Sequence, residues 1–430
     1  MTSITNWGEN KLAKKKNNRV KDYKIFYNEP HIVKNDIGDY NTANMQIFGV
    51  NVVMARHVPS VIDGLKPGER RALYAVYKSK RDKKTSMIDA ISETLKIHPH
   101  GDASVYGILI GMGQKWKNMV CPLDDMGENY GCVDGFSSKE AAPRYLDVKL
   151  SKFALDCFFD DFDERIVDMR PSYNGETAEP LYLPAKYPTV FINGASGMAF
   201  GYSVCIPYYN IRELLYYTIK LIEDPNKNYG IIVPDSPVPC EIVDKPGVFK
   251  ALQYQGYTIT KGKADRSATF RMRSIIEKDE ENHTLTIRSL PPQCSAEKLF
   301  TGIKALRDAN VLTGCRKINN NTQDDVIDVV LSFKDEVDLD EARSLLYSTK
   351  LMTENDYSAQ VTVIDDMKIK RYSVRDCLLR WIEVRRDFKR RYYNMRIVID
   401  RARVHVLDIL MFLFAKNNAE RTLKILKNSE

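Results

Sequence analysis

Hydrophobic residues recur with a helical period in the first part of the chain. From Tyr40 the pattern predicts a helix, a turn punctuated by proline and glycine, and a second helix that starts near Gly68. Two further helical segments, 85–98 and 99–116, are joined by a short Pro-Gly turn, which is typical of a helix-turn-helix. The first part of the chain is therefore predicted to be mainly helical.

The pattern changes after the dipeptide Arg144-Tyr145. Helical spacing directly after it predicts an amphipathic helix that faces a core, with apolar positions Leu150, Phe153, Ala154, Cys157 and Phe158. Segment 176–207 is rich in proline, and its short apolar runs are separated by glycines, which predicts strands. The helical part is thus expected to pass into a region of sheet.

Helices and strands mix between residue 210 and about residue 375. Phe270 and Met272 alternate with arginines as in a half-buried strand. A second strand is predicted in 284–290, and the charged run 277–282 reads as the tip of a hairpin. The overall fold class is therefore predicted to be α+β.

From about Asp376 the strands cease and one long helical pattern begins. Its apolar residues follow the 3-4-3-4 spacing of a coiled-coil seam: Tyr392, Met395, Ile399, Ala402, Val406, Ile409 and Leu413. A single long helix on a globular core is the alternative. In either case the basic run 385–391 is expected to be an exposed face.

Composition limits the class of protein. The chain has 430 residues, 43% hydrophobic and 28% charged, which suits two or three globular domains. Its eight cysteines form no CxxC pair, so we expect reduced thiols and neither a zinc site nor a disulfide framework. No apolar run approaches the roughly 20 residues that span a bilayer. The lysine-rich N-terminus is not followed by the hydrophobic segment of a signal peptide. We expect a cytoplasmic protein without membrane contact.

The net charge of +7 is mildly basic, and its clustering is more informative than its size. Residues 1–39 are rich in lysine and predict a basic arm, which either contacts phosphates or a partner or is a solvated terminus. Cations with interleaved Tyr74 and Tyr77 predict a surface for a phosphate backbone. These cations are Arg56, Lys66, Arg70, Arg71, Lys78 and Lys80.

The turn between the two central helices carries His98, His100 and Asp102. These residue types bind metals, but no third His or Cys lies nearby in the sequence, so contact between the imidazoles and phosphate is the preferred interpretation. Neither G-x-G-x-x-G nor a P-loop occurs, and the segment 261–263 lacks the required upstream glycine and the Ser/Thr. We therefore expect no ATP site in this chain.

Arg144-Tyr145 is the candidate for covalent chemistry. A free phenol has a pKa of about 10 and needs a cation, a metal or a base before it attacks a phosphate. The adjacent guanidinium supplies a permanent positive charge and can hold phosphate bidentately. By itself the dipeptide is a weak indication, because most Arg-Tyr pairs are a half-buried ring beside a solvated charge.

Four motifs in order carry a family resemblance: DGLKPGERRALY (63–74), HPHGDASVY (98–106), AAPRY (141–145) and PTVFINGASGMAFGYSVCIP (188–207). Together they closely resemble the breakage-reunion subunit of type IIA DNA topoisomerases, the gyrase A and topoisomerase IV A family. The resemblance implies a winged-helix DNA-gate domain, a tower domain and a long antiparallel coiled coil. The boundaries we expect are 1–39 for the basic arm, 40–172 for the winged-helix domain, 173–375 for the tower and 376–430 for the start of the coiled coil.

The resemblance also implies roles for single residues. Tyr145 would be the nucleophile that forms a 5′-phosphotyrosyl bond, and Arg144 would stabilise the transition-state phosphate. Met198 would be the wedge that bends the cleaved duplex, where the family usually has isoleucine. Positions that would contact the scissile or neighbouring phosphates are Arg56, Lys66, Arg70, Arg71, His98 and His100.

The same resemblance implies an assembly. Two copies of this chain would bind double-stranded DNA in an A2B2 complex with a gyrase B-like subunit. No acidic Toprim motif occurs in the sequence, so the partner would hold the Mg²⁺ and also hydrolyse ATP. A non-catalytic winged-helix protein of architectural function is the alternative, and Tyr145 with its Arg and His neighbours is the feature that separates the two.

Some features depart from the common bacterial members. The loop before AAPRY is about two residues longer, a proline precedes Arg144, and the arm is richer in lysine, which indicates a divergent or phage-type enzyme. Ala103 and Gly107 stand where those members carry the serine and acidic residue that anchor quinolones, so we expect quinolone insensitivity. Glu430 falls inside the coiled coil, so we expect a piece of a longer protein or one that is short by nature.

Overall fold

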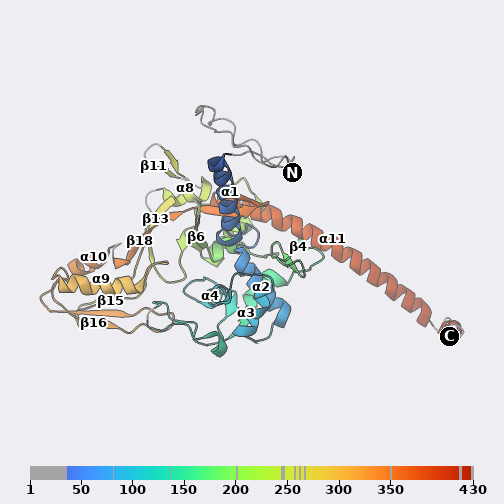
Figure 1. Cartoon of the computed structure of the whole chain (residues 1–430), viewed down its shortest axis with the longest axis horizontal. Helices are drawn as coiled ribbons and strands as arrows, with labels where there is room; N and C mark the ends of the chain where they lie inside the picture. Colours follow the sequence, from blue (N-terminus) through green and yellow to red (C-terminus); the bar gives the residue numbers. More distant parts are fainter. Residues whose placement is uncertain are drawn as a thin grey trace, which may run out of the picture. The chain divides into compact units, whose positions relative to one another are not determined.

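The computed structural model describes residues 36–80, 82–135, 137–199, 202–243, 247–255, 258–260, 263–265, 268–348, 351–415 and 419–427 (Figure 1). Residues 1–35 of the predicted arm, residues 261 and 262, and the last three residues of the predicted coiled coil lie outside this description. The chain divides into two compact units, Met1–Phe48 and Gly49–Glu430, and each is described by itself.

Helix α1 (Ile37–Val52) confirms the helix predicted from Tyr40 and begins three residues earlier. It begins there because the carboxylate of Asp36 accepts the backbone N–H groups of Gly38 (2.8 Å) and Asp39 (3.2 Å), which satisfies donors of the first turn. In the second unit a short π-helical turn, η1 (Val53–His57), continues the chain.

Three helices and a small sheet enclose one core of the second unit. The helices are α2 (Pro67–Lys80), α3 (Met87–Leu95) and α4 (Asp102–Gly113). They confirm the helix predicted near Gly68 and the two predicted helices with a turn between them. Helix α3 begins where Ser86 Oγ accepts the N–H of Asp89, and its buried face carries Met87, Ala90 and Ile91.

The sheet of this core has three antiparallel strands in the order β1-β3-β2. Its strands are β1 (Thr85–Ser86), β2 (Leu123–Asp124) and β3 (Asp147–Leu150). The prediction that a helix directly follows Tyr145 is therefore wrong, because β3 intervenes and contains Leu150. The helix α5 (Lys152–Ala154) starts only after Ser151, whose Oγ caps the N–H of Ala154, and it passes into the π turn η3 (Leu155–Phe159).

A second core is built from strands and helices of the middle of the chain. Its sheet has the order β10-β13-β18, and the hairpins β6-β7 and β19-β20 lie beside it. Phe270 and Met272 of β13 are buried and the intervening residues are half-buried, which confirms the predicted alternation. The strands are β6 (Ala195–Ala199), β7 (Tyr202–Ile206), β10 (Glu241–Val243), β13 (Ala268–Arg273), β18 (Glu354–Ala359), β19 (Val361–Asp365) and β20 (Lys368–Tyr372).

Helices and short pairings complete this middle part. The helices are α6 (Thr189–Ile192), α7 (Ile211–Glu223) and α8 (Val248–Tyr254). The short strand pairs are β4 (Met169–Pro171) with β5 (Ala178–Pro180), β8 (Tyr208–Tyr209) with β9 (Pro234–Asp235), and β11 (Thr258–Thr260) with β12 (Lys263–Asp265).

A third core lies against a four-stranded sheet of order β14-β15-β17-β16. The strands are β14 (Ile276–Asp279), β15 (Thr284–Ile287), β16 (Cys315–Asn320) and β17 (Val329–Phe333), and helices α9 (Ala296–Asp308) and α10 (Leu339–Leu346) pack on the buried face. The predicted hairpin tip 277–282 is partly wrong. Residues 277–279 belong to β14, an edge strand, and edge strands commonly carry charges.

The strands end before α11 (Val374–Phe414), which confirms the long helix predicted from about Asp376. Ser373 Oγ caps the N–H of Asp376, and the first turns bury Leu378, Trp381 and Phe388. A shorter helix, α12 (Ala419–Lys427), follows. The coiled-coil seam itself stays a prediction.

Helices and sheets together confirm the α+β class. In the part of the chain that the structure describes, no helix is both long and apolar enough to cross a membrane. The winged-helix and tower assignments, and their boundaries, stay predictions.

Candidate active site

Tyr145 stands at the end of the short helix η2 (Pro143–Tyr145), directly before the central strand β3. The next residue, Leu146, is buried, and its carbonyl accepts the N–H of Met87 at 2.9 Å. Tyr145 itself is 68% exposed. A fixed backbone therefore presents an exposed phenol.

The loop before Tyr145 is fastened on both sides. Tyr106 of α4 donates its hydroxyl hydrogen bond to the carbonyl of Ala141, and the N–H of Ala141 binds the carbonyl of Asn129 at 3.1 Å. After Tyr145, the N–H of Asp147 donates to Glu128 Oε2 at 2.5 Å. These contacts link the AAPRY motif to α4 and to the Gly-rich loop that precedes it.

Arg144 lies over the ring of Tyr145, with its guanidinium carbon 4.7 Å from the ring centroid. Both side chains are exposed. Among the described residues the phenol oxygen has no hydrogen-bond partner, so it is accessible to an incoming group. The pair combines a nucleophile with a donor-rich cation in one place.

His98 and His100 form a second group of predicted site residues. Their rings stack at 4.2 Å with an interplanar angle of 16°. Arg71 Nη1 lies 3.0 Å from His98 Nδ1. Burial lowers the pKa of His98 to about 4, with His100 and Arg71 adding to the effect. Burial, then Arg56 and Arg71, also lowers the pKa of His100, so both imidazoles are neutral near pH 7.

Arg70 and Arg71 are neighbours on α2, and each binds a buried carboxylate. Arg70 is 6% exposed, and its Nε and Nη2 donate to Asp63 at 2.6 and 2.9 Å. Arg71 binds Glu179 but also reaches His98, and its side chain is 15% exposed. Because the guanidinium of Arg70 is bound inside the protein, we do not include Arg70 among the phosphate contacts proposed below.

Lys66 binds the hairpin β6-β7, which carries Met198. Lys66 Nζ donates to the carbonyl of Ser196 at 2.8 Å, two residues from Met198. The Met198 side chain is 80% exposed on β6. Gly197 permits the hairpin to approach η1, since a Cβ there would lie 3.1 Å from the carbonyl oxygen of His57. Arg56 is exposed on the same η1 turn.

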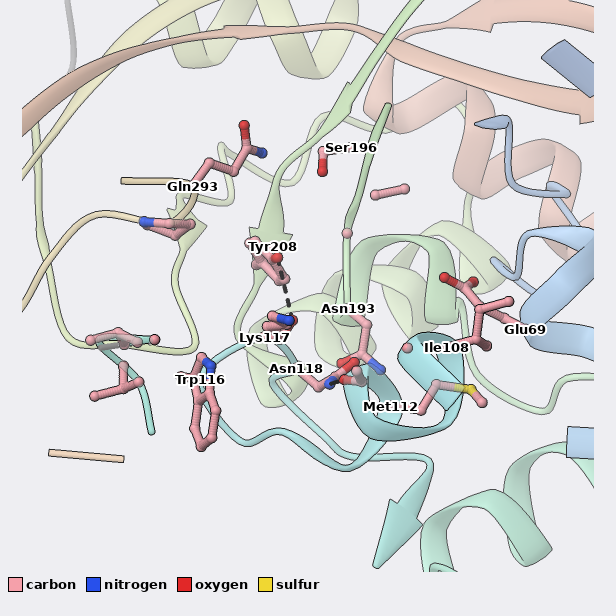
Figure 2. A pocket seen from close by; sticks show the side chains of 18 of the residues that line it. Glu69, Ile108, Met112, Trp116, Lys117, Asn118, Asn193, Ser196, Tyr208 and Gln293 are labelled. Carbon is pink, nitrogen blue, oxygen red and sulfur yellow. Dashed lines mark hydrogen bonds between the residues drawn. The ribbon is translucent and has the colours of Figure 1, made fainter. Parts of the chain in front are cut away.

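A cavity of ≈ 850 Å³ opens beside α4 (Figure 2). Gly107, Ile108 and Met112 of α4 line one part of it, and Lys66 and Ser196 line another. Figure 2 shows Trp116, Lys117 and Tyr208 around it, with Tyr208 donating to the carbonyl of Lys117 at 3.4 Å. The cavity thus adjoins both the predicted helix-turn-helix and the Met198 hairpin.

The structure therefore brings the predicted residues together in three groups, which are Arg144 with Tyr145, Arg71 with His98 and His100, and Lys66 with the hairpin that carries Met198. Tyr145 is not joined to His98 by a hydrogen bond or ring contact among the described residues.

A family model for the A-type chain of DNA gyrase and topoisomerase IV matches residues 56–430. The chain belongs to this family. The match includes all four motifs and confirms the resemblance found in the sequence. All seven described side chains of the three groups lie inside it.

Curated relatives agree with the family assignment. The DNA gyrase A protein of Neisseria gonorrhoeae is 27% identical over 397 residues, 89% of this chain and 41% of the relative. The gyrase A protein of Buchnera aphidicola from Acyrthosiphon pisum is 30% identical over 399 residues, 89% and 45% of the two chains. That of Buchnera aphidicola from Baizongia pistaciae is 29% identical over 412 residues, 93% and 46%. The chain spans less than half the length of these gyrase proteins.

The sequence did not predict a buried carboxylate that binds Arg71 or two of the residues that line the cavity. Glu179 of β5 is buried and binds Arg71, but it lies 108 residues from it and belongs to no motif. Trp116 and Lys117 line the cavity, and only their aromatic-basic pairing at the end of the predicted helix could have indicated them. Burial lowers the pKa of Lys117 below its ordinary value.

Proposed function

We propose that this chain is the DNA-cleaving and religating part of a type IIA topoisomerase, with Tyr145 as its nucleophile. The observation that carries the proposal is an exposed phenol, 68% accessible, with a guanidinium over its ring in a family of gyrase A-like chains. Membership in the family supports the reaction class, and the geometry supports the residue. Passage of a second duplex through the break would follow from cleavage by two copies of the chain.

In the proposed step the phenol oxygen of Tyr145 attacks a DNA phosphorus. A P–O bond to tyrosine forms as the P–O3′ bond breaks, the phenol loses its proton, and the 3′ oxygen leaves as a hydroxyl after gaining one. The phosphodiester energy is kept in the 5′-phosphotyrosyl bond, so the 3′ hydroxyl can reverse the step without a cofactor. Arg144 would donate to the phosphate oxygens as charge develops on them.

The surroundings would hold and bend the DNA. His98 and His100 are neutral near pH 7 and would donate N–H groups to phosphate, and Arg56, Lys66 and Arg71 would add positive charge. The exposed Met198 would insert between base pairs and bend the duplex. The hydrogen bond from Lys66 to the carbonyl of Ser196 supports a shared role for Lys66 and the hairpin β6-β7 in binding DNA.

A partner subunit would bind the Mg²⁺ and hydrolyse the ATP. Among the described residues no group of three or more His, Cys, Asp or Glu is arranged to hold a metal ion, and we derive no step through Mg²⁺. Mg²⁺ would supply charge neutralisation at the phosphate when the partner binds it. We propose that a gyrase B-like subunit brings the metal and the ATPase to an A2B2 assembly.

Covalent trapping tests the function. The chain is mixed with a gyrase B-like subunit, Mg²⁺ and supercoiled DNA and then denatured; we expect DNA bound to protein, and none with Tyr145→Phe. Tyr216→Phe is the matched control, because Tyr216 is 66% exposed and also has a cation, Lys220, over its ring at 5.7 Å. An adduct in Tyr145→Phe would overturn the nucleophile. Salt-dependent binding without any cleavage would favour the architectural alternative.

A further inference from the structure

A buried carboxylate lies behind the histidine pair. Glu179 is 2% exposed on β5, and its two oxygens bind the guanidinium of Arg71, with Nη2 to Oε1 at 2.9 Å. Arg170, the residue opposite Glu179 in the β4-β5 pair, donates through Nε to Oε1 at 2.8 Å. Two arginines thus hold one carboxylate, and the carboxylate fixes the plane of the Arg71 guanidinium.

The guanidinium of Arg71 determines which nitrogen of His98 carries the proton. Arg71 Nη1 lies 3.0 Å from His98 Nδ1. A guanidinium has only donors, so Nδ1 must accept this hydrogen bond and cannot carry a proton itself. A neutral His98 therefore has its N–H at Nε2.

The Nε2 edge of His98 lies beside Gly68 of α2, and His98 as a whole is 3% exposed. Among the described residues Nε2 has no hydrogen-bond partner. A Cβ at residue 68 would lie 3.4 Å from Nε2 and 2.9 Å from Ile108 Cδ1, so a side chain at this position would crowd the imidazole. The N–H at Nε2 therefore has no partner within the described part of the chain.

The charges around His98 come from every element packed on it. Arg71 of α2, Arg56 of η1 and the stacked His100 all disfavour a second proton, and Glu179 of β5 favours it. Burial is the largest influence, and together these effects lower the pKa of His98 to about 4. Burial would raise the pKa of Glu179, but Arg71 and Arg170 lower it below its ordinary value, so the carboxylate stays charged.

We propose that Glu179 is a positioning residue of the DNA-cleavage site, which holds Arg71 so that His98 offers a neutral Nε2–H group to a DNA phosphate. This inference rests on the proposed function, because the phosphate is the ligand of that site. Glu179 does not touch the DNA; it acts through Arg71. A neutral donor can bind a phosphate oxygen without adding a further charge to the site.

The tautomer can be measured without any cleavage. The full chain is labelled with ¹⁵N-histidine, and long-range ¹H–¹⁵N correlation spectra are recorded from pH 5.5 to 8, with the His98 signal assigned by its loss in His98→Gln. We expect a neutral Nε2–H ring throughout this range in the unaltered protein. In Glu179→Gln we expect a mixture of tautomers. An Nδ1–H or protonated His98 in the unaltered protein would overturn the inference whatever the variants do.

A matched control lies in the same cluster. Arg170→Gln removes an arginine from the same carboxylate but leaves the bond between Glu179 and Arg71, so we expect the His98 tautomer to be unchanged. An identical spectrum of His98 in Glu179→Gln and in the unaltered protein would also overturn the role of Glu179.

Cleavage provides the second measurement. With the B-type partner, Mg²⁺ and DNA, we expect Glu179→Gln to lower the trapped covalent complex about tenfold to a hundredfold, with DNA affinity changed by less than about twofold. A loss of affinity that matches the loss of cleavage would contradict positioning. If the unaltered protein forms no adduct at all, the proposed function fails. The tautomer result still decides whether Glu179 acts on His98 through Arg71.

Discussion

Tyr145 and His98 stand in opposite environments within the same candidate site. The phenol of Tyr145 is 68% exposed and its only ring contact among the described residues is with Arg144, whereas His98 is 3% exposed and is held by Arg71 and the ring of His100. The contrast shows a division of labour. The nucleophilic phenol is left accessible, whereas the hydrogen bond and the ring contact of His98 are fixed inside the protein before DNA arrives.

Substitutions in the interior region are expected to lower the free energy of unfolding more than substitutions in the exposed region. We expect Asp63→Asn to lower the free energy of unfolding by about 3–5 kcal/mol, because it leaves the charge of the buried Arg70 unpaired. Urea denaturation measures this. Asp163→Asn is the control, since the Arg165–Asp163 pair has the same 2.6 Å separation but an Arg that is 63% exposed, and we expect less than about 1 kcal/mol. Equal losses of unfolding free energy in the two variants would contradict the difference between the interior and the exposed region.

The exposed region should show the reverse behaviour. We expect Arg144→Ala to lower the rate of DNA cleavage by about 10²–10³-fold, which is the loss typical of one transition-state donor. Its stability should change by less than about 0.5 kcal/mol because the side chain is exposed. Single-turnover cleavage and urea denaturation give the two values. A destabilised Arg144→Ala protein with normal cleavage would reverse the assignment of the two regions.

Acid should act on the interior region first. The pKa of His98 is about 4 in the folded state and near 6.5 when unfolded, so between these values the unfolded chain binds a proton that the folded chain does not. Stability present above pH 6.5 is therefore lost as the pH falls toward 4. We expect a loss of about 2 kcal/mol from pH 7 to pH 5 from this residue. A His98→Gln protein with the same pH slope would contradict the shift.

The smallest effect is expected at the exposed hairpin. We expect Met198→Ala to weaken binding of a bent duplex about fivefold and to reduce its bending, with stability unchanged, because a wedge acts only on DNA. Energy transfer between dyes at the duplex ends measures the bend. Met411→Ala, at a side chain 73% exposed on α11, should leave both values unchanged. Equal bending by the Met198→Ala protein would exclude the wedge.

The sequence predicted the exposed region better than the interior one. Tyr145, Arg144 and Met198 belong to contiguous motifs, and the helices around them follow local periodicity. Glu179 could not be predicted, because its contact with Arg71 joins residues 108 positions apart. Arg70 and Arg71 were predicted alike, yet successive helical residues point about 100° apart, and only the tertiary fold decides which one faces the core.

Contacts between residues far apart in the sequence also explain the errors in the predicted fold. Leu150 fits a helical spacing with Phe153 and Ala154, but its pairing with Leu123 of β2 places it in a strand. The charged residues 277–279 read as a turn, yet pairing with β15 extends β14 through them. In both places a partner distant in sequence overrides a local pattern.

The most direct test locates the covalent bond. The trapped complex is digested with a nuclease and trypsin, and the peptides that carry nucleotide are sequenced by mass spectrometry. We predict a nucleotide joined through its 5′ phosphate to Tyr145, and to no other residue. Attachment to another side chain, or linkage through a 3′ phosphate, would contradict the central claim that the exposed phenol of Tyr145 is the nucleophile.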